Sequence, residues 1–138
     1  MSLEQKKAVV RRCWEECLNK RNLAIIDELV APEYVWHGPS QELSGPAGIK
    51  QLATSLLTAF PDLQMTFEDQ LGEGDKIASR YTMRGTHQGD LFGVPPTGKQ
   101  ATFTGIFMSR MAGGQIAEEW EHFDQLGMLQ QLGVVPRI

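Results

Sequence analysis

The 138-residue sequence lacks several features that would assign its class directly. No apolar run approaches the roughly 20 residues that a bilayer-spanning helix needs. The segment Met1–Lys7 has no apolar stretch of the secretory type. Basic residues are not in excess, because 13 Lys and Arg stand against 17 Asp and Glu, giving a net charge of −4. These absences argue against a membrane span, an anionic membrane surface and nucleic acid as partners, and they predict a cytoplasmic protein.

Residues that hold metals or phosphates are also scarce. The only two cysteines, Cys13 and Cys17, lie four apart in a helical pattern. A disulfide between consecutive turns would restrain almost nothing, so we expect two small core residues. The three histidines show no helical ligand spacing, and no glycine-rich phosphate cradle is present. The sequence therefore predicts neither a metal site nor a cofactor.

The period of the apolar residues changes once along the chain, from helical to alternating. The first part predicts helices over 2–20, 22–30 and 44–60, with a short strand at Tyr34–His37 before the third helix. The second part predicts strands over 63–71, 76–87, 101–111 and 116–124, followed by a helix over 125–132.

This grouping of elements predicts an α+β fold in a single domain over residues 1–138, because no linker or repeat interrupts the chain. We expect a conical, curved antiparallel sheet wrapped by the three N-terminal helices, with a short C-terminal helix. Such a sheet leaves a central cavity that would take a small apolar molecule.

The last predicted strand contains most of the side chains that could take part in catalysis. Read with period two, Ile116, Glu118, Trp120, His122 and Asp124 share one face. A carboxylate beside large aromatic side chains in a poorly hydrated pocket would have a raised pKa suited to proton transfer. Alternatively, Asp124 is the N-cap of the following helix, a position that favours Asp. One carboxylate can fill both roles.

Four segments of the sequence resemble the SnoaL-like polyketide cyclase family, within the nuclear-transport-factor-two-like superfamily. They are Phe60–Leu63, Gly85–Gly89, Gly93–Lys99, and the C-terminal set of Glu119, Trp120, Asp124 and Gln131–Gly133. The resemblance covers nearly the whole chain in the expected order.

The resemblance implies a conical α+β barrel that forms a homodimer through its sheet. It also implies a pocket aspartate that acts as general acid and base in an intramolecular aldol closure of an aromatic polyketide methyl ester, without metal or cofactor. Asp124 is the position that matches this aspartate.

Other polar residues each have two interpretations at this stage. His122 either orients Asp124 or donates to an enolate oxygen, or it is a histidine near the surface or hydrogen-bonded in the core. His87 either takes part in catalysis or fixes the loop 88–98, and His37 either lines the cavity mouth or fixes the turn at Gly38–Pro39. Arg80 either reaches the pocket as a cation or lies on the outer face of the sheet.

Several large aromatic residues are predicted to line the cavity as well as the core. They are Trp14, Trp36, Phe67, Tyr81 and Trp120.

The sequence as a whole favours a cofactor-independent enzyme of the ester cyclase type, with Asp124 and His122 as catalytic residues. Two alternatives stay open. The same carboxylate could serve an isomerase or a hydrolase on this fold, or the pocket could bind an apolar metabolite without catalysis.

Overall fold

The computed structural model describes residues 1–135. The first half contains three helices and two strands: α1 Leu3–Asn19, α2 Ile25–Leu29, β1 Val30–His37, β2 Glu42–Ser44 and α3 Gly45–Ala59. The second half contains four strands and a helix: β3 Gln64–Glu73, β4 Lys76–Thr86, β5 Gln100–Ala112, β6 Gln115–Phe123 and α4 Gln125–Gln131.

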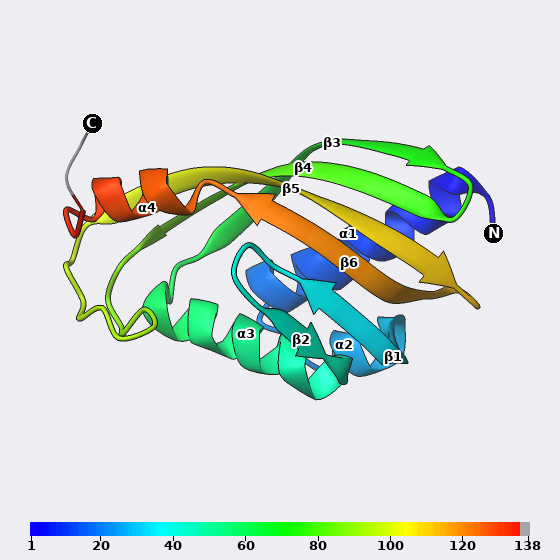
Figure 1. The fold of residues 1–138 in the computed structure, drawn as a ribbon, viewed down its shortest axis with the longest axis horizontal. Coiled ribbons are helices and arrows are strands. Elements are labelled where there is room, and N and C mark those ends of the chain that lie inside the picture. The colour runs from blue at the N-terminus through cyan, green and yellow to red at the C-terminus, as the bar shows by residue number, and fades with distance from the viewer. Residues whose placement is uncertain (136–138) are drawn as a thin grey trace.

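All six strands form one curved sheet in the order β2-β1-β6-β5-β4-β3. The sheet curls around α1 and α3, which pack against β3 and β1, and α4 lies against β5 (Figure 1). The predicted α+β class is therefore confirmed. The sheet is not antiparallel throughout, however, because β1 runs parallel to β6.

The helices begin and end where the local sequence directs. Ser2 caps α1 by accepting from the Gln5 N–H, while the Gln5 side chain accepts from the Ser2 N–H, so the predicted capping box is present. Both cysteines are buried and free, as predicted. Within residues 1–135 no helix is both long and apolar enough to span a membrane.

The β1–β2 region departs from the prediction. Strand β1 begins at Val30 rather than Tyr34, and its register against β6 shifts between Val30 and Val35. Pro32 lies inside this irregular stretch, which tolerates a residue without a backbone N–H. The three-residue strand β2 was not predicted, and it closes a hairpin around residues 38–41.

Strand β6 contains a bulge that decides which side chains face inward. Ile116 pairs with Met111 and Glu118 pairs with Arg110, so Ala117 is an extra residue without a partner on β5. Ile116 and Ala117 are consequently both buried. Compared with a strand that alternates regularly from Ile116, every later side chain therefore lies on the opposite face of the sheet.

Candidate active site

A cavity of about 520 Å³ lies between the inner face of the sheet and the helices. Its walls are largely apolar. The lining includes Trp14 and Leu18 from α1, Leu52 and Leu56 from α3, Met65, Met83, Phe103 and Phe107 from the strands, Met128 and Leu129 from α4, and Leu91 and Phe92 from the loop after β4. A volume of this size is in the range of natural small-molecule sites.

Two carboxylates enter this apolar space from β6. Glu119 and Glu121 lie two residues apart, beyond the Ala117 bulge, and both line the cavity. Because alternate residues of a strand share a face, the bulge is the reason that these two glutamates point inward.

Glu119 is the deeper carboxylate, with 2% of its surface exposed. Its Oε1 accepts from the Tyr34 hydroxyl at 2.8 Å, and its Oε2 accepts from Trp14 Nε1 at 3.1 Å and from Ser109 Oγ at 2.5 Å. Burial raises the pKa of Glu119 to about 7, although these three hydrogen bonds act in the opposite direction. Glu119 therefore changes its charge near neutral pH.

Glu121 lies nearer the open space and has two aromatic donors. Its Oε1 accepts from Trp36 Nε1 at 3.0 Å, and its Oε2 accepts from the Tyr81 hydroxyl. Burial raises the pKa of Glu121, and the hydrogen bonds from Tyr81 and Trp36 reduce that rise. Burial also raises the pKa of Tyr81, so its hydroxyl stays a neutral donor at neutral pH. Two donors fix the carboxylate in place, and each oxygen keeps acceptor capacity for a further proton.

Asp124 does not occupy the position that the sequence predicts for it. Its carboxylate is exposed, caps α4 by accepting from the Gly127 N–H at 2.9 Å, and is not among the cavity-lining groups. The capping interpretation is confirmed, and the expectation that Asp124 points into the cavity is wrong. The cause is the Ala117 bulge. Strict alternation from the buried Ile116 ignores the extra residue and so assigns every later residue to the wrong face.

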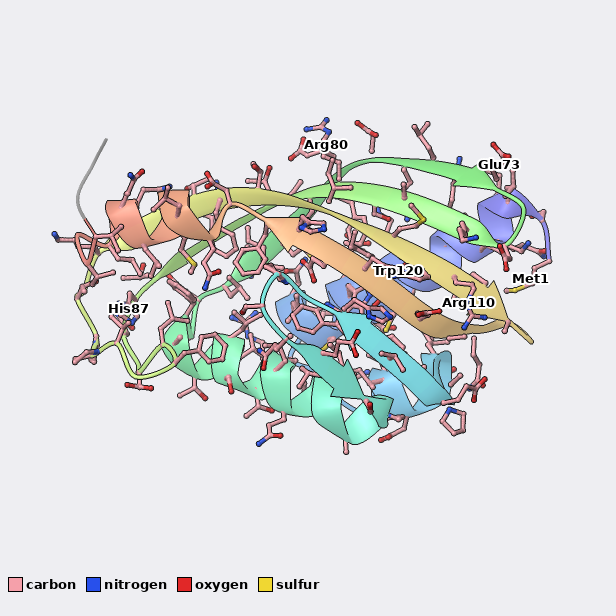
Figure 2. All side chains as sticks on the ribbon, in the orientation of Figure 1. Met1, Glu73, Arg80, His87, Arg110 and Trp120 are labelled. Carbon is pink, nitrogen blue, oxygen red and sulfur yellow. The ribbon has the colours of Figure 1, made fainter. Side chains whose placement is uncertain are left out.

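The same error applies to the other residues predicted on that face. His122 is exposed and Trp120 is half-buried, and both lie outside the cavity lining. Trp120 and His122 pair with Met108 and Ile106 of β5, whose side chains are exposed on the outer face of the sheet. Arg80 also projects from this outer face and forms an ion pair with Asp69 at 2.9 Å (Figure 2).

His37 ends β1 next to the turn of the β1–β2 hairpin, outside the cavity lining. Its Nδ1 and Nε2 each lie 2.6 Å from a carboxylate oxygen, of Glu42 and Glu118 respectively, and its ring stacks on Trp120 at 5.4 Å. The hydrogen bond with Glu118 is the main reason that the pKa of His37 is raised. The interpretation that His37 fixes the adjoining turn therefore matches these contacts.

His87 is fully buried at the start of the loop after β4 and does not line the cavity (Figure 2). Its backbone N–H donates to the Lys99 carbonyl, its carbonyl accepts from the Gly98 N–H, and its Nδ1 accepts from the Thr97 N–H at 3.2 Å. These bonds close the loop 88–98, as the structural interpretation of His87 expects. Phe67 packs in the core against Phe107 and is not part of the lining.

Three of the predicted lining residues do face the cavity. Trp14, Trp36 and Tyr81 contribute to its wall, and each donates a hydrogen bond to one of the two glutamates. Contact between these side chains and a substrate stays a prediction.

Gly105 is a residue of the site that the sequence analysis missed. It faces inward on β5 opposite Tyr81, and a Cβ atom at this position would lie 2.4 Å from the Tyr81 hydroxyl oxygen. Glycine inside a strand often marks a close approach, and this signal was available in the sequence. Only a residue without a side chain leaves Tyr81 free to reach Glu121.

Replacement of Gly105 by Ala is expected to lower the free energy of unfolding by ~1–3 kcal/mol, because the added methyl overlaps the Tyr81 ring. Urea unfolding measures the change. Gly48→Ala is the matched control, since a Cβ there meets no atom closer than 3.4 Å and the position is helical. Equal stability of the two variants would show that Tyr81 does not need the space at Gly105.

A curved α+β sheet around an apolar cavity defines the nuclear-transport-factor-two-like fold, which ketosteroid isomerase-like proteins share. A protein of ketosteroid isomerase-like fold from Catenulispora acidiphila superposes with a TM-score of 0.78 over 92% of this chain and 93% of that one, at 14% identity, which shows the fold alone. The family model of the SnoaL-like polyketide cyclases matches residues 8–132. The chain belongs to this family, whose named members are enzymes.

Individual relatives agree with the family assignment. An aklanonic acid methyl ester cyclase of Streptomyces sp. (strain C5) is 31% identical over 110 residues, covering 79% of this chain and 67% of that protein. The nogalonic acid methyl ester cyclase of Streptomyces nogalater is 27% identical over 114 residues, covering 78% and 83%.

Two solved structures superpose closely on this chain. IdmH of Streptomyces antibioticus, a candidate polyketide cyclase, superposes with a TM-score of 0.81 at 33% identity, covering 94% of this chain and 99% of that one. TsrD of Streptomyces laurentii superposes with a TM-score of 0.89 at 25% identity, covering 98% and 99%.

Proposed function

We propose that this protein closes a carbon ring in an apolar aromatic ester by intramolecular aldol addition, without a cofactor, and that Glu121 is the general acid and base. The observation that carries the proposal is the Glu121 carboxylate, which lies inside an apolar cavity of about 520 Å³ and is held there by Trp36 and Tyr81. Removal of water around a carboxylate makes it a stronger base.

The reaction needs one proton to leave and one to return. Glu121 removes a proton from the carbon beside the ester carbonyl, and the resulting enolate carbon attacks a ketone carbonyl of the same molecule. A C–C bond forms while the C=O π bond breaks, and the alkoxide takes the proton from Glu121 to become a hydroxyl group. The product is an isomer of the substrate, so no atom or electron is supplied from outside.

The remaining polar lining residues provide donors for the developing negative charge. Ser40 and Gln41 reach the cavity from the β1–β2 hairpin, and Gln125 reaches it from the start of α4. An uncharged donor within hydrogen-bond distance of the enolate oxygen lowers the barrier, because the charge develops at that oxygen in a water-poor site.

The test uses the methyl esters after which the related cyclases are named. Purified protein is incubated with aklanonic acid methyl ester or nogalonic acid methyl ester, and the products are separated by chromatography and analysed by mass spectrometry and NMR. We expect a product of unchanged mass with a new C–C bond. Binding of the ester without conversion, and without exchange of its acidic C–H in D₂O, would contradict the proposal and favour a binding protein.

We also propose that the protein forms a homodimer through the outer face of the sheet. Ile106 and Met108 of β5 are 54% and 39% exposed there, beside the half-buried Trp120 of β6. An apolar strip on an otherwise polar sheet face is typical of a contact surface. Light scattering is expected to give twice the chain mass of 15.4 kDa, and Met108→Glu is expected to give the single mass. A monomeric wild-type protein would exclude this interface.

A further inference from the structure

The charge of the cavity wall has only one sign. Among residues 1–135, the lining includes two carboxylates, Glu119 and Glu121, and no Lys, Arg or His. The other polar contributions from each surrounding element are neutral: Ser40 and Gln41 from the hairpin and Gln125 from α4. The α3 wall is entirely apolar. A bound anion would therefore meet no opposite charge in the cavity.

One basic group acts on Glu121 from the other face of the strand. His122 lowers the pKa of Glu121 by its charge, but its side chain is on the outer, exposed face of β6. His37 also lies outside the lining, where Glu42 and Glu118 occupy both of its ring nitrogens. Neither histidine provides a cation to a molecule inside the cavity.

Aromatic rings form much of the rest of the wall. The lining contains Trp14, Trp36, Tyr81, Phe92, Phe103, Phe107 and Phe123. The face of an aromatic ring carries partial negative charge, and it attracts an ammonium group most strongly where water is excluded. Rings and carboxylates together favour positive charge in a space that is otherwise apolar.

We propose that the cavity selects its ligand by charge, so that a ring-bearing organic cation binds more tightly than its neutral isostere and the corresponding carboxylate is excluded. The inference concerns the ligand class of the cyclase site and rests on that assignment of the cavity, but it describes binding at equilibrium and needs no turnover. It predicts that a natural ligand of this protein is neutral or carries an amino group, and has no free carboxylate near Glu119 and Glu121.

The test compares three probes of similar size by isothermal titration calorimetry at pH 8. They are benzyltrimethylammonium, neopentylbenzene, in which carbon replaces the charged nitrogen, and phenylacetate. We expect the cation to bind roughly tenfold or more tightly than neopentylbenzene, and phenylacetate to show no binding. Because the quaternary ammonium cannot lose a proton, its affinity should rise between pH 5 and pH 8 as Glu119, whose pKa is about 7, ionises.

Two variants separate the cavity charge from the general acidity of the protein. Glu121→Gln is expected to reduce the preference for the cation while neopentylbenzene still binds. Glu68→Gln removes the same charge from an exposed position on β3 and should leave the preference unchanged. Equal binding of the cation and its isostere, binding of phenylacetate at comparable strength, or no binding by any probe would overturn the inference. Cyclisation of the ester without a charge preference in binding would refute only this inference. A charge preference in binding without cyclisation would refute only the proposed reaction.

Discussion

Replacement of Glu121 by Gln is expected to lower the rate of ring closure by about 10²- to 10⁴-fold, the range that a general acid or base contributes. Glutamine keeps the size of the side chain, and its amide oxygen can still accept the hydrogen bond from Trp36 or Tyr81. It cannot take a proton from carbon. The effect should therefore fall on kcat, with little change in KM or in the melting temperature, and steady-state kinetics with the methyl ester measures it.

Asp124→Asn is the matched control on the same strand end. Asn is as good an N-cap as Asp, so α4 should keep its hydrogen bond from the Gly127 N–H and turnover should stay near the wild-type rate. The opposite pattern, with Asp124→Asn inactive and Glu121→Gln active, would exclude Glu121 as the base. It would also return the catalytic role to the residue that the family resemblance suggests.

The stability of the protein is expected to fall as the pH rises from about 5 to 8, because Glu119 must ionise inside the core. Its pKa is about 7 in the folded protein, against an ordinary value of 4.5. Between these two values the folded state binds more protons than the unfolded state, so the free energy of unfolding decreases with pH. The pKa difference corresponds to a total loss of about 3 kcal/mol that is complete above pH 7. Glu121 contributes in the same direction, since its pKa is also raised.

Urea unfolding at several pH values tests this expectation with Glu119→Gln. At position 119 the variant has no group that can ionise, so its stability relative to wild type should increase by about 2–3 kcal/mol between pH 5 and pH 8. His37→Gln is the control. The raised pKa of His37 stabilises the fold below pH 6.5, and that contribution is lost at higher pH. The stability of His37→Gln should therefore still fall between pH 5 and pH 6.5. A wild-type protein whose stability is constant from pH 5 to pH 8 would contradict the assignment of a raised pKa to Glu119.

The helices and long strands could be predicted from the sequence because each has a clear apolar period. The stripe of Cys13, Trp14 and Cys17 identifies α1, and the alternation in β4 and β5 identifies two half-buried strands. The parallel pairing of β1 with β6 could not be predicted, because it joins segments about 85 residues apart and has no local signal.

The prediction of where the candidate site lies was wrong for a different reason. All seven residues of 118–124 are polar or aromatic, so both faces of the strand look suitable for a pocket. Only the register against β5 shows that Ala117 is an extra residue and that Glu119 and Glu121 face inward. Gly105 could have been identified as a close-approach position, but its neighbour Tyr81 lies on another strand.

The bulge at Ala117 accommodates one extra residue in β6, and the residues after it pair regularly with β5. If Ala117 paired regularly with Arg110 instead, the register would shift by one residue, and Glu118, Trp120 and His122 would lie on the inner face in place of Glu119 and Glu121. The chemical groups inside the cavity thus depend on the presence of this bulge as much as on the residues of the strand. Transfer of a catalytic role between homologous chains should therefore count positions from the bulge rather than from the nearest matching motif.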